Sequence, residues 1–208
     1  MRLSLASYLG HAEPETRIAN KVALVVGGNG PFYPLYLHWL TPEAGPLSLL
    51  TMLAAPLFLA VPLIARQNGF AGRIALIVTG LANVLWCTAL LGPASGVPLF
   101  VLPCVALALS VWRDRLVMLA LLGLCLVAQQ GAMRWPWPGL SGLSPERQAD
   151  LQGMNATSVA ALVAFLVLTA AGELRLTPAA PASSPRSPAA EAAGDNPRPP
   201  RRSDRSPK

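Results

Sequence analysis

The sequence predicts an all-α membrane protein, a six-transmembrane-helix bundle followed by a disordered C-terminal tail. Three observations predict this fold class. Of the 208 residues, 53% are hydrophobic and only 12% are charged, which is about half the charged share of an ordinary soluble domain. The charged residues are grouped, and long uncharged stretches separate the groups. The basic residues also fall mainly in every second connection between the expected helices, which lie on one side of the membrane. A soluble α/β enzyme, a disulfide scaffold and a nucleic-acid-binding domain are therefore poor interpretations.

The uncharged stretches define the expected helices. A helix of about 20 apolar residues crosses the hydrocarbon core of a bilayer. Residues 74–112 carry no charge and have room for two such helices, separated by the Gly- and Pro-rich residues 92–98. Residues 22–65 carry only Glu43 and divide in the same way at residues 41–46. The expected helices cover about residues 18–40, 47–65, 73–91, 98–112, 115–132 and 153–175.

Prolines fall inside several of these expected helices. Transmembrane helices tolerate proline because neighbouring groups satisfy the freed carbonyl oxygen, and we expect a kink at each position. The fourth helix, 98–112, is the shortest, and a re-entrant segment is the alternative for it. The five prolines concerned are Pro31, Pro34, Pro56, Pro62 and Pro103.

The distribution of Lys and Arg predicts the orientation. With six spans, all of the 16 basic residues except Arg134 and Arg147 fall on one side. Basic residues in short loops mark the cytoplasmic side. We therefore expect a multi-pass protein of the inner cell membrane with both termini in the cytoplasm. Trp39, Trp135 and Trp137 lie at the expected outer boundary, where amphipathic rings are favoured, whereas Trp86 lies inside a helix and is expected to pack in the core.

The two ends of the chain differ from the helical region in composition. Residues 1–17 lack the continuous apolar stretch of a signal peptide and are interpreted as a cytoplasmic lead-in. Residues 177–208 are rich in Pro, Ala, Ser and Arg. Such a segment has too few large apolar residues to offset the entropy of ordering. It is predicted to be a disordered cytoplasmic tail, either held near an anionic leaflet or simply solvated.

No catalytic, metal-binding or cofactor-binding pattern is visible. Cys87, Cys104 and Cys125 lie on three different expected helices at apolar positions, without paired spacing. An intramembrane serine protease would need a base beside a serine such as Ser95, and the last three expected helices contain neither His nor Lys. We therefore expect a protein that is not an enzyme and that uses no cofactor and no metal.

Small and polar residues inside the helices suggest other roles. Small residues recur at four-residue steps in the last helix and favour close helix packing. We expect packing within the monomer, with a dimer interface as the alternative. These residues are Ala156, Ala160, Ala164 and Gly172. The uncharged polar residues that could contact a neutral solute at membrane depth are Asn29, Asn83 and Gln129.

Residues 92–103 read Gly-Pro-Ala-Ser-Gly-Val-Pro-Leu-Phe-Val-Leu-Pro. This segment resembles the outer loop and fourth helix of a six-helix membrane sensor domain at the N-terminus of bacterial adenylate/guanylate cyclases and sensor histidine kinases. That family has the pattern Gly-x-x-Ser-Gly-x-x-Leu-Phe-x-x-Pro. Asn83, the basic turn at 112–115 and Asn155 are similar too. The resemblance implies a presumed receptor. Because Pro178 and Pro181 interrupt continuation of the last helix, we expect the module to lack its own effector domain.

The sequence therefore favours a stand-alone, non-catalytic sensor module that binds a lipophilic or membrane-associated ligand or partner. The expected partners are the lipid bilayer and either a second copy of the chain or a separate cytoplasmic signalling protein. No nucleic-acid partner is expected. The alternatives are a small permease for a neutral solute and a structural membrane protein that recruits a partner through its tail. The residues expected to contact a ligand or partner are His38, Trp39, Ser95, Trp135 and Trp137.

Overall fold

A computed structural model describes residues 5–137 and 143–176, without the side chains of Glu43, Leu174 and Leu176. The chain divides into two units, Met1–Thr177 and Pro178–Lys208. Only the first unit contains described residues. The predicted disordered tail, 177–208, lies outside them.

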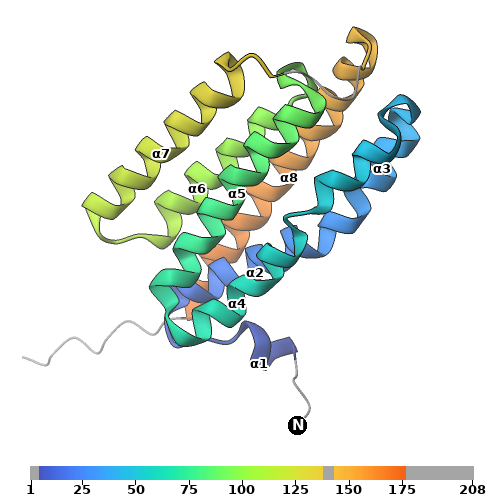
Figure 1. The fold of residues 1–208 in the computed structure, drawn as a ribbon. Helices are drawn as coiled ribbons and strands as arrows, with labels where there is room; N and C mark the ends of the chain where they lie inside the picture. Colours follow the sequence, from blue (N-terminus) through green and yellow to red (C-terminus); the bar gives the residue numbers. More distant parts are fainter. Residues whose placement is uncertain (1–4, 138–142, 177–208) are drawn as a thin grey trace, which may run out of the picture. The chain divides into compact units, whose positions relative to one another are not determined.

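The described residues are helical almost throughout (Figure 1). The α-helices in chain order are α1 (Leu5–Leu9), α2 (Pro14–Asn29), α3 (Tyr33–Leu40), α4 (Ala55–Gln67), α5 (Gly69–Leu91), α6 (Val101–Val111), α7 (Arg115–Arg134) and α8 (Pro145–Leu176). The 3₁₀ segments are η1 (Gly30–Phe32), η2 (Pro42–Met52), η3 (Pro93–Ser95) and η4 (Val97–Phe100).

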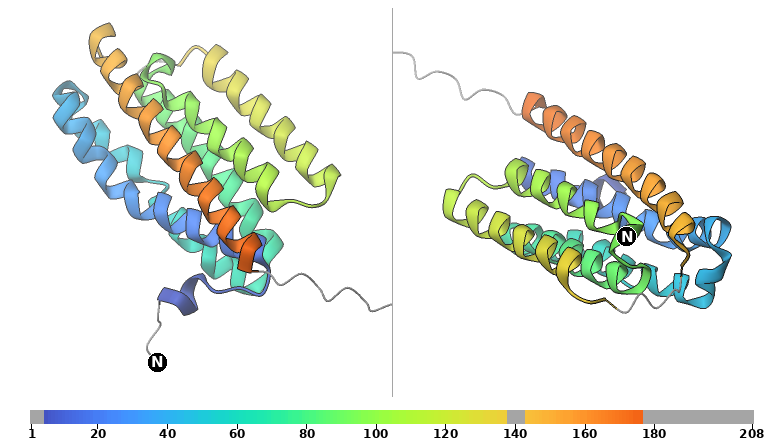
Figure 2. Two further views of the ribbon diagram at one scale, coloured as in Figure 1. Left: turned by 180° about the vertical axis from the view of Figure 1, so that it is seen from behind. Right: turned by 90° about the horizontal axis from the view of Figure 1, so that it is seen from above.

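These elements form six antiparallel passes between two ends of the bundle (Figures 1 and 2). At one end, here called the charged end, Glu173 of α8 pairs with Arg17 of α2, and Arg113 pairs with Glu15. Arg73 of α5 reaches Glu13 at the same end. The other end, here called the turn end, contains the turns at 41–46 and 92–98. The passes are α2–η1–α3, η2–α4, α5, η4–α6, α7 and α8.

The first pass is less regular than the expected continuous helix 18–40. It begins earlier, at Pro14, and changes to a 3₁₀ turn at Gly30–Phe32. A Cβ atom on Gly30 would lie 2.6 Å from the Cβ of Ala55, so glycine permits the close approach of η1 to α4. The lead-in of 1–17 is also partly helical, because α1 lies within it.

Most of the five prolines that were predicted to kink a helix do not lie in a helix interior, which corrects the prediction. Pro31, Pro34 and Pro56 lie in the first turn of η1, α3 and α4, where the missing N–H costs no hydrogen bond. Pro103 lies two residues into α6, and Pro62 lies inside α4. The prolines therefore mainly divide the first two passes into shorter helical segments.

Four of the described helices are long and apolar enough to cross a membrane. They are Ala44–Gln67, Gly69–Leu91, Arg115–Arg134 and Pro145–Glu173, and Val97–Val111 is a shorter apolar helix. The last helix begins eight residues before the predicted start at 153. The Ser144 hydroxyl accepts a hydrogen bond from the N–H of Arg147 and so caps a polar first turn that precedes the apolar residues.

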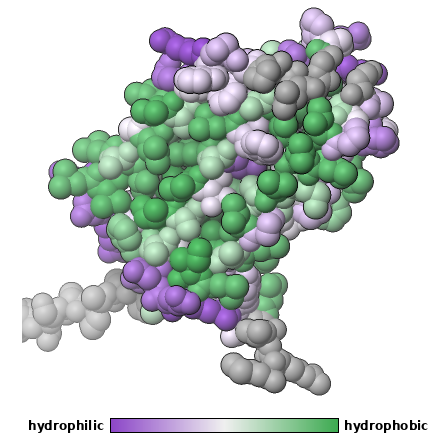
Figure 3. Space-filling view, in the orientation of Figure 1, coloured by the Kyte–Doolittle hydropathy of each residue, from purple (hydrophilic) through white to green (hydrophobic). Residues whose placement is uncertain are grey.

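On the face shown in Figure 3, the surface between the two ends is largely apolar. The outer sides of α7 and α8 carry large exposed residues such as Leu116, Val127 and Leu168. Such a surface would not remain free in water but is compatible with lipid chains. Trp86 belongs to it as well. It is 41% exposed and donates its Nε1–H to the carbonyl oxygen of Leu50 at 2.9 Å, so the prediction that it packs in the core is wrong.

Candidate functional site

A cavity of about 790 Å³ lies inside the bundle. Residues of α2, α4, α5, α6 and α8 line it, together with residues of η1, η2, α3 and η4. Along α5 it extends from Leu76 to Cys87, a distance of roughly 16 Å for eleven helical steps. The cavity is therefore elongated in the direction of the helices.

The polar lining residues lie toward one end of the cavity. The side chains of Asn29, Tyr33, Thr51, Asn83 and Ser158 line its half nearer the turn end. Toward the charged end, the lining residues include Val22, Leu76, Leu107 and Phe165. Among the described residues that line the cavity, none is Asp, Glu, Lys, Arg or His. The cavity is thus uncharged and polar at one end only.

A buried polar junction closes the bundle beside the polar half of this cavity. The Asn155 side chain is fully buried, and its Nδ2 donates to the carbonyl oxygen of Ser95 at 2.9 Å. The Tyr33 hydroxyl donates to Asn155 Oδ1 at 3.0 Å. Ser95 Oγ donates to the carbonyl oxygen of Gly92 at 2.6 Å. The junction therefore connects α8, the 92–98 turn and the start of α3 through satisfied hydrogen bonds.

Two glycines shape the turn that contributes to this junction. Gly92 has φ +84° and Gly96 has φ +81°, a region that favours glycine. A Cβ on Gly96 would also lie 2.8 Å from the Cα of Gln152 on α8. The Gly-x-x-Ser-Gly pattern therefore has a structural cause, because both glycines set the backbone and Ser95 closes the turn.

A second polar cluster holds the charged end of α8. Glu173 has a side chain that is 4% exposed, and its two carboxylate oxygens lie 2.7 Å from Arg17 Nε and 2.6 Å from Lys21 Nζ. These three residues are here called the Glu173 cluster. It joins α8 to α2 one helical pass away from the Asn155 junction, so α8 is held by polar contacts near both of its ends.

Further charged contacts surround this end of the bundle. Arg73 lies over the ring of Trp112, with its guanidinium carbon 4.8 Å from the ring centroid, and Phe70 packs edge-on against the same ring. Burial raises the pKa of the Glu15 carboxyl, but hydrogen bonds from its own backbone N–H and from the Arg113 guanidinium lower it more. The pKa of Glu15 therefore lies below its ordinary value of 4.5.

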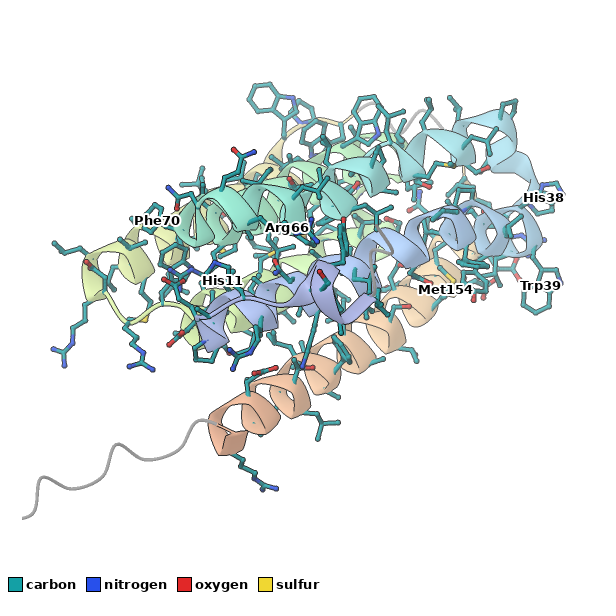
Figure 4. All side chains as sticks on the ribbon, turned by 90° about the horizontal axis from the view of Figure 1, so that it is seen from below. His11, His38, Trp39, Arg66, Phe70 and Met154 are labelled. Carbon is teal, nitrogen blue, oxygen red and sulfur yellow. The ribbon has the colours of Figure 1, made fainter. Side chains whose placement is uncertain are left out.

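The structure separates the five predicted contact residues into two groups. His38 and Trp39 are exposed at the end of the bundle away from Phe70 (Figure 4). Trp135, which directly follows α7, is exposed, and Trp137 is partly exposed. Ser95 is fully buried, so unlike the other four residues it is not accessible to a ligand or partner at the surface. Its hydroxyl and carbonyl oxygen are both used within the Asn155 junction.

The predicted intramembrane residues also divide. Asn29 and Asn83 line the cavity, whereas Gln129 lies on α7 and does not. The small residues of α8 do not pack within the monomer as predicted, because Ala156, Ala160, Ala164 and Gly172 are all exposed. Large residues on the opposite side of α8, such as Leu151 and Leu166, form its buried face instead.

Within the part of the chain that the structure describes, the side chains that could bind a metal ion lie apart from one another. Within residues 5–137 and 143–176, no three His, Cys, Asp or Glu side chains are grouped so that they could hold a metal ion. Cys87, Cys104 and Cys125 are buried thiols. The polar side chains that line the cavity are carboxamides and hydroxyls, and most of its other lining residues are apolar.

The comparisons with known proteins give a family for this arrangement. The sequence model of the MASE7 membrane-associated sensor domain matches residues 8–181. The chain belongs to the MASE7 family. No curated protein and no solved structure matches it. The MASE7 match includes all six helical passes, the cavity, the Asn155 junction and the Glu173 cluster. The predicted resemblance to a membrane sensor domain is thus confirmed at the level of a multi-pass sensor domain.

Two residues of this MASE7 domain were not predicted as functional from sequence. Tyr33 is the partner of Asn155, and Glu173 is the carboxylate at the centre of the charged cluster. Glu173 could have been found as the first charge after the uncharged stretch 151–172, facing an excess of basic residues. Tyr33 had no comparable signal, because its partner is 122 residues away.

Proposed function

We propose that this MASE7 domain is a non-catalytic receiver for a lipophilic signal in a bacterial inner membrane. The elongated, uncharged cavity supports this function most directly. Its position within the bundle suits a ligand that partitions into the bilayer. The cavity wall includes Ser158, Ala161 and Phe165 of α8. Since the Glu173 cluster holds the same helix to α2, occupancy of the cavity can change how α8 leaves the membrane.

We further propose that all six passes span the membrane and that both termini are cytoplasmic. The first pass supplies the span that is hardest to recognise by length, because η1 divides it into two short helices. The charged end contains Arg17, Lys21, Arg66, Arg73 and Arg113, as expected for a cytoplasmic face. The exposed Trp39 and Trp135 would then lie at the outer interface.

The output would pass to a second copy of the chain or to a separate cytoplasmic signalling protein. A signal carried by α8 reaches the cytoplasm beside Arg17 and Lys21. The exposed charged side chains there, such as Arg66 and Arg175, would offer contacts to such a protein.

The test is a distance measurement across the charged end. Spin labels would be attached through Ala12→Cys and Arg175→Cys, both at exposed positions, in the full chain with the native cysteines replaced by alanine. The labelled protein would be reconstituted in nanodiscs with and without dodecanol. A sensor should show a shifted distance distribution when dodecanol is bound. A distribution that stays unchanged at saturating dodecanol would argue against signal transmission through α8.

A permease for a neutral solute is the second candidate, and the uncharged polar half of the cavity favours it. Asn29 and Asn83 line that half, but Gln129 on α7 lies apart from it. A transport path needs access from both sides of the membrane. Uptake of glycerol by proteoliposomes above the rate of protein-free vesicles would support the permease, and equal rates would support the receiver.

A further inference from the structure

We infer that the cavity binds a neutral, single-chain amphiphile with its polar group at Asn29 and Asn83 and its chain directed toward the charged end. This inference names the ligand class of the proposed receiver, and it rests on the proposed function for the role that the bound ligand plays. The binding itself can be tested without any signalling readout. Four properties of the cavity lead to this ligand class and orientation.

The first property is that some hydrogen-bonding side chains in the cavity wall have donors that no other group of the protein occupies. Within the described residues, the Asn29 side chain makes no hydrogen bond. The Asn83 side chain only accepts a weak one from Cys87 Sγ, at 3.5 Å. Tyr33, Thr51 and Ser158 each donate to a protein oxygen instead. The carboxamides of Asn29 and Asn83 therefore leave donors available, and a hydroxyl or carbonyl oxygen matches them.

The second property is the absence of charge among the described lining residues. A carboxylate, phosphate or ammonium group placed in this half would lose its hydration without gaining an ion partner. The free-energy cost of such burial is several kcal/mol even after relaxation. A phospholipid headgroup or a fatty-acid carboxylate is thus disfavoured relative to an uncharged polar group.

The third property is the shape and composition of the opposite half. Its walls are formed by apolar residues from four helices, including Val22, Leu76, Leu107 and Phe165. Gly80 also lies in this region, and a Cβ there would be 3.0 Å from Cys104 Sγ, so the glycine widens the space beside α6. An extended alkyl chain fits a cavity that is elongated over roughly 16 Å, with its apolar half toward the charged end, better than a compact ring system does.

The fourth property is lateral access. Val25, Asn29 and Phe32 line the cavity and are also exposed on the outside of the bundle, and Ala161 of α8 is exposed as well. These residues lie between the charged end and the turn end, at the depth that lipid chains occupy in a six-span arrangement. An amphiphile can therefore enter from the bilayer between α2 and α8, without crossing the polar turns.

Photo-crosslinking tests the orientation on the unmodified chain. Two dodecanol probes are needed, one with a diazirine on the terminal carbon and one with it next to the hydroxyl. The full chain in nanodiscs would be irradiated and digested. The terminal label should map to peptides containing Leu76, Leu107 or Phe165, and the other label to those containing Asn29 or Asn83. Identical labelling patterns, or labelling confined to the outer residues of α7, would overturn the inference.

Affinity measurements test the head group. Dodecanol, dodecane and dodecanoate would be compared by their displacement of the labelled probe. Dodecanol should bind most tightly. Asn83→Leu should weaken dodecanol binding by roughly tenfold, the effect of one lost hydrogen bond, and leave dodecane binding unchanged. Gln129→Leu is the matched control, because it removes a carboxamide outside the cavity and should change neither affinity.

The results separate this inference from the proposed function. Tighter binding of dodecanoate than of dodecanol would overturn the neutral head group. Equal binding of dodecane and dodecanol would overturn the role of the two asparagines. If dodecanol binds as expected while the spin-label distances at α8 stay unchanged, the ligand assignment stands and only the sensor function fails.

Discussion

At the scale of single residues, Asn155 connects more of the structure than any of the predicted contact residues. It is buried, it accepts from Tyr33, and it donates to the main chain of the 92–98 turn. A buried carbonyl oxygen that loses its donor keeps the full cost of its desolvation. The stability of the turn end should therefore depend strongly on this carboxamide.

Replacing Asn155 by alanine should lower the free energy of unfolding by about 1–3 kcal/mol, because Ser95 O and the Tyr33 hydroxyl lose their partner. The measurement is thermal unfolding of the full chain in detergent. Thr157→Ala serves as the control, because its exposed hydroxyl only returns to the carbonyl oxygen of Gly153. Equal midpoints for the two variants would contradict a structural role for the junction.

Gly96→Ala should destabilise the chain by more than about 1 kcal/mol, since it combines a left-handed backbone with a close contact at Gln152 Cα. Gly153→Ala is the matched control on the adjacent helix, where a Cβ meets nothing within 4 Å. Alanine is a better helix former than glycine, so this control should leave the midpoint unchanged or raise it. The same unfolding assay compares the two.

The pair of Glu15 and Arg113 should contribute stability only where Glu15 is ionised. The pKa of Glu15 in the folded chain lies below 4.5, its value without the fold. The contribution is therefore fully present above pH 4.5 and is lost as the pH falls through the lower folded pKa. Wild type and Arg113→Gln should differ by a constant, small midpoint shift from about pH 8 to about pH 5. That difference should narrow in more acid solution, and a difference that widens there would contradict the assignment.

At the scale of helices, the boundaries of a pass were predictable where the length of the uncharged stretch alone determines them. The boundaries of α5 and α7 lie within a few residues of 73–91 and 115–132. Asn68 and Asp114 cap these helices through their side-chain oxygens. The first two passes were less predictable, because proline and glycine divide them and only the packing against neighbours decides whether a division is a kink or a new helix start.

The face of α8 was predicted incorrectly for a similar reason. A four-residue spacing identifies a stripe on a helix, but in a membrane both lipid and protein accept small or large apolar residues. Burial therefore cannot be derived from hydrophobicity. The structure buries Leu151, Asn155, Val159 and Leu166 and leaves the Ala156–Ala160–Ala164 side outward.

Ala164→Ile should consequently leave the unfolding midpoint of the monomer unchanged, since the added atoms extend away from the bundle. Leu166→Ala, on the buried side, should cost about 2–5 kcal/mol through the cavity it creates. Both variants would be measured in detergent, with size-exclusion chromatography to record the oligomeric state. A strong destabilisation by Ala164→Ile without any change of oligomer would contradict the orientation of α8.

At the scale of the whole molecule, the charge pattern predicted the arrangement better than helix length did. Among the helices that the structure describes, only four meet the length and hydropathy expected of a span. Ion pairs nevertheless bring residues 13–21, 73, 113 and 173 to one end. This clustering requires an even number of passes between them. The cavity could not be predicted, because it depends on side chains from five passes.

Accessibility labelling should place the two ends on opposite sides of the membrane. Ala94→Cys and Gln67→Cys are both exposed, at the turn end and the charged end respectively. They would be introduced singly after replacement of the three native cysteines by alanine. A membrane-impermeant maleimide should label Ala94→Cys in intact cells and Gln67→Cys only after lysis. Labelling of both in intact cells would contradict six spans.

The described residues that line the cavity carry no charge, and this determines how ligand binding depends on the energetics of the cell. A charged ligand that moved partway across the membrane would gain or lose up to about 2.3 kcal/mol per 100 mV. A neutral ligand bound to asparagine carboxamides transfers no charge and takes up no proton. Its occupancy would therefore be independent of the membrane voltage and of the proton gradient. The domain would report the concentration of the amphiphile equally in energised and in starved cells.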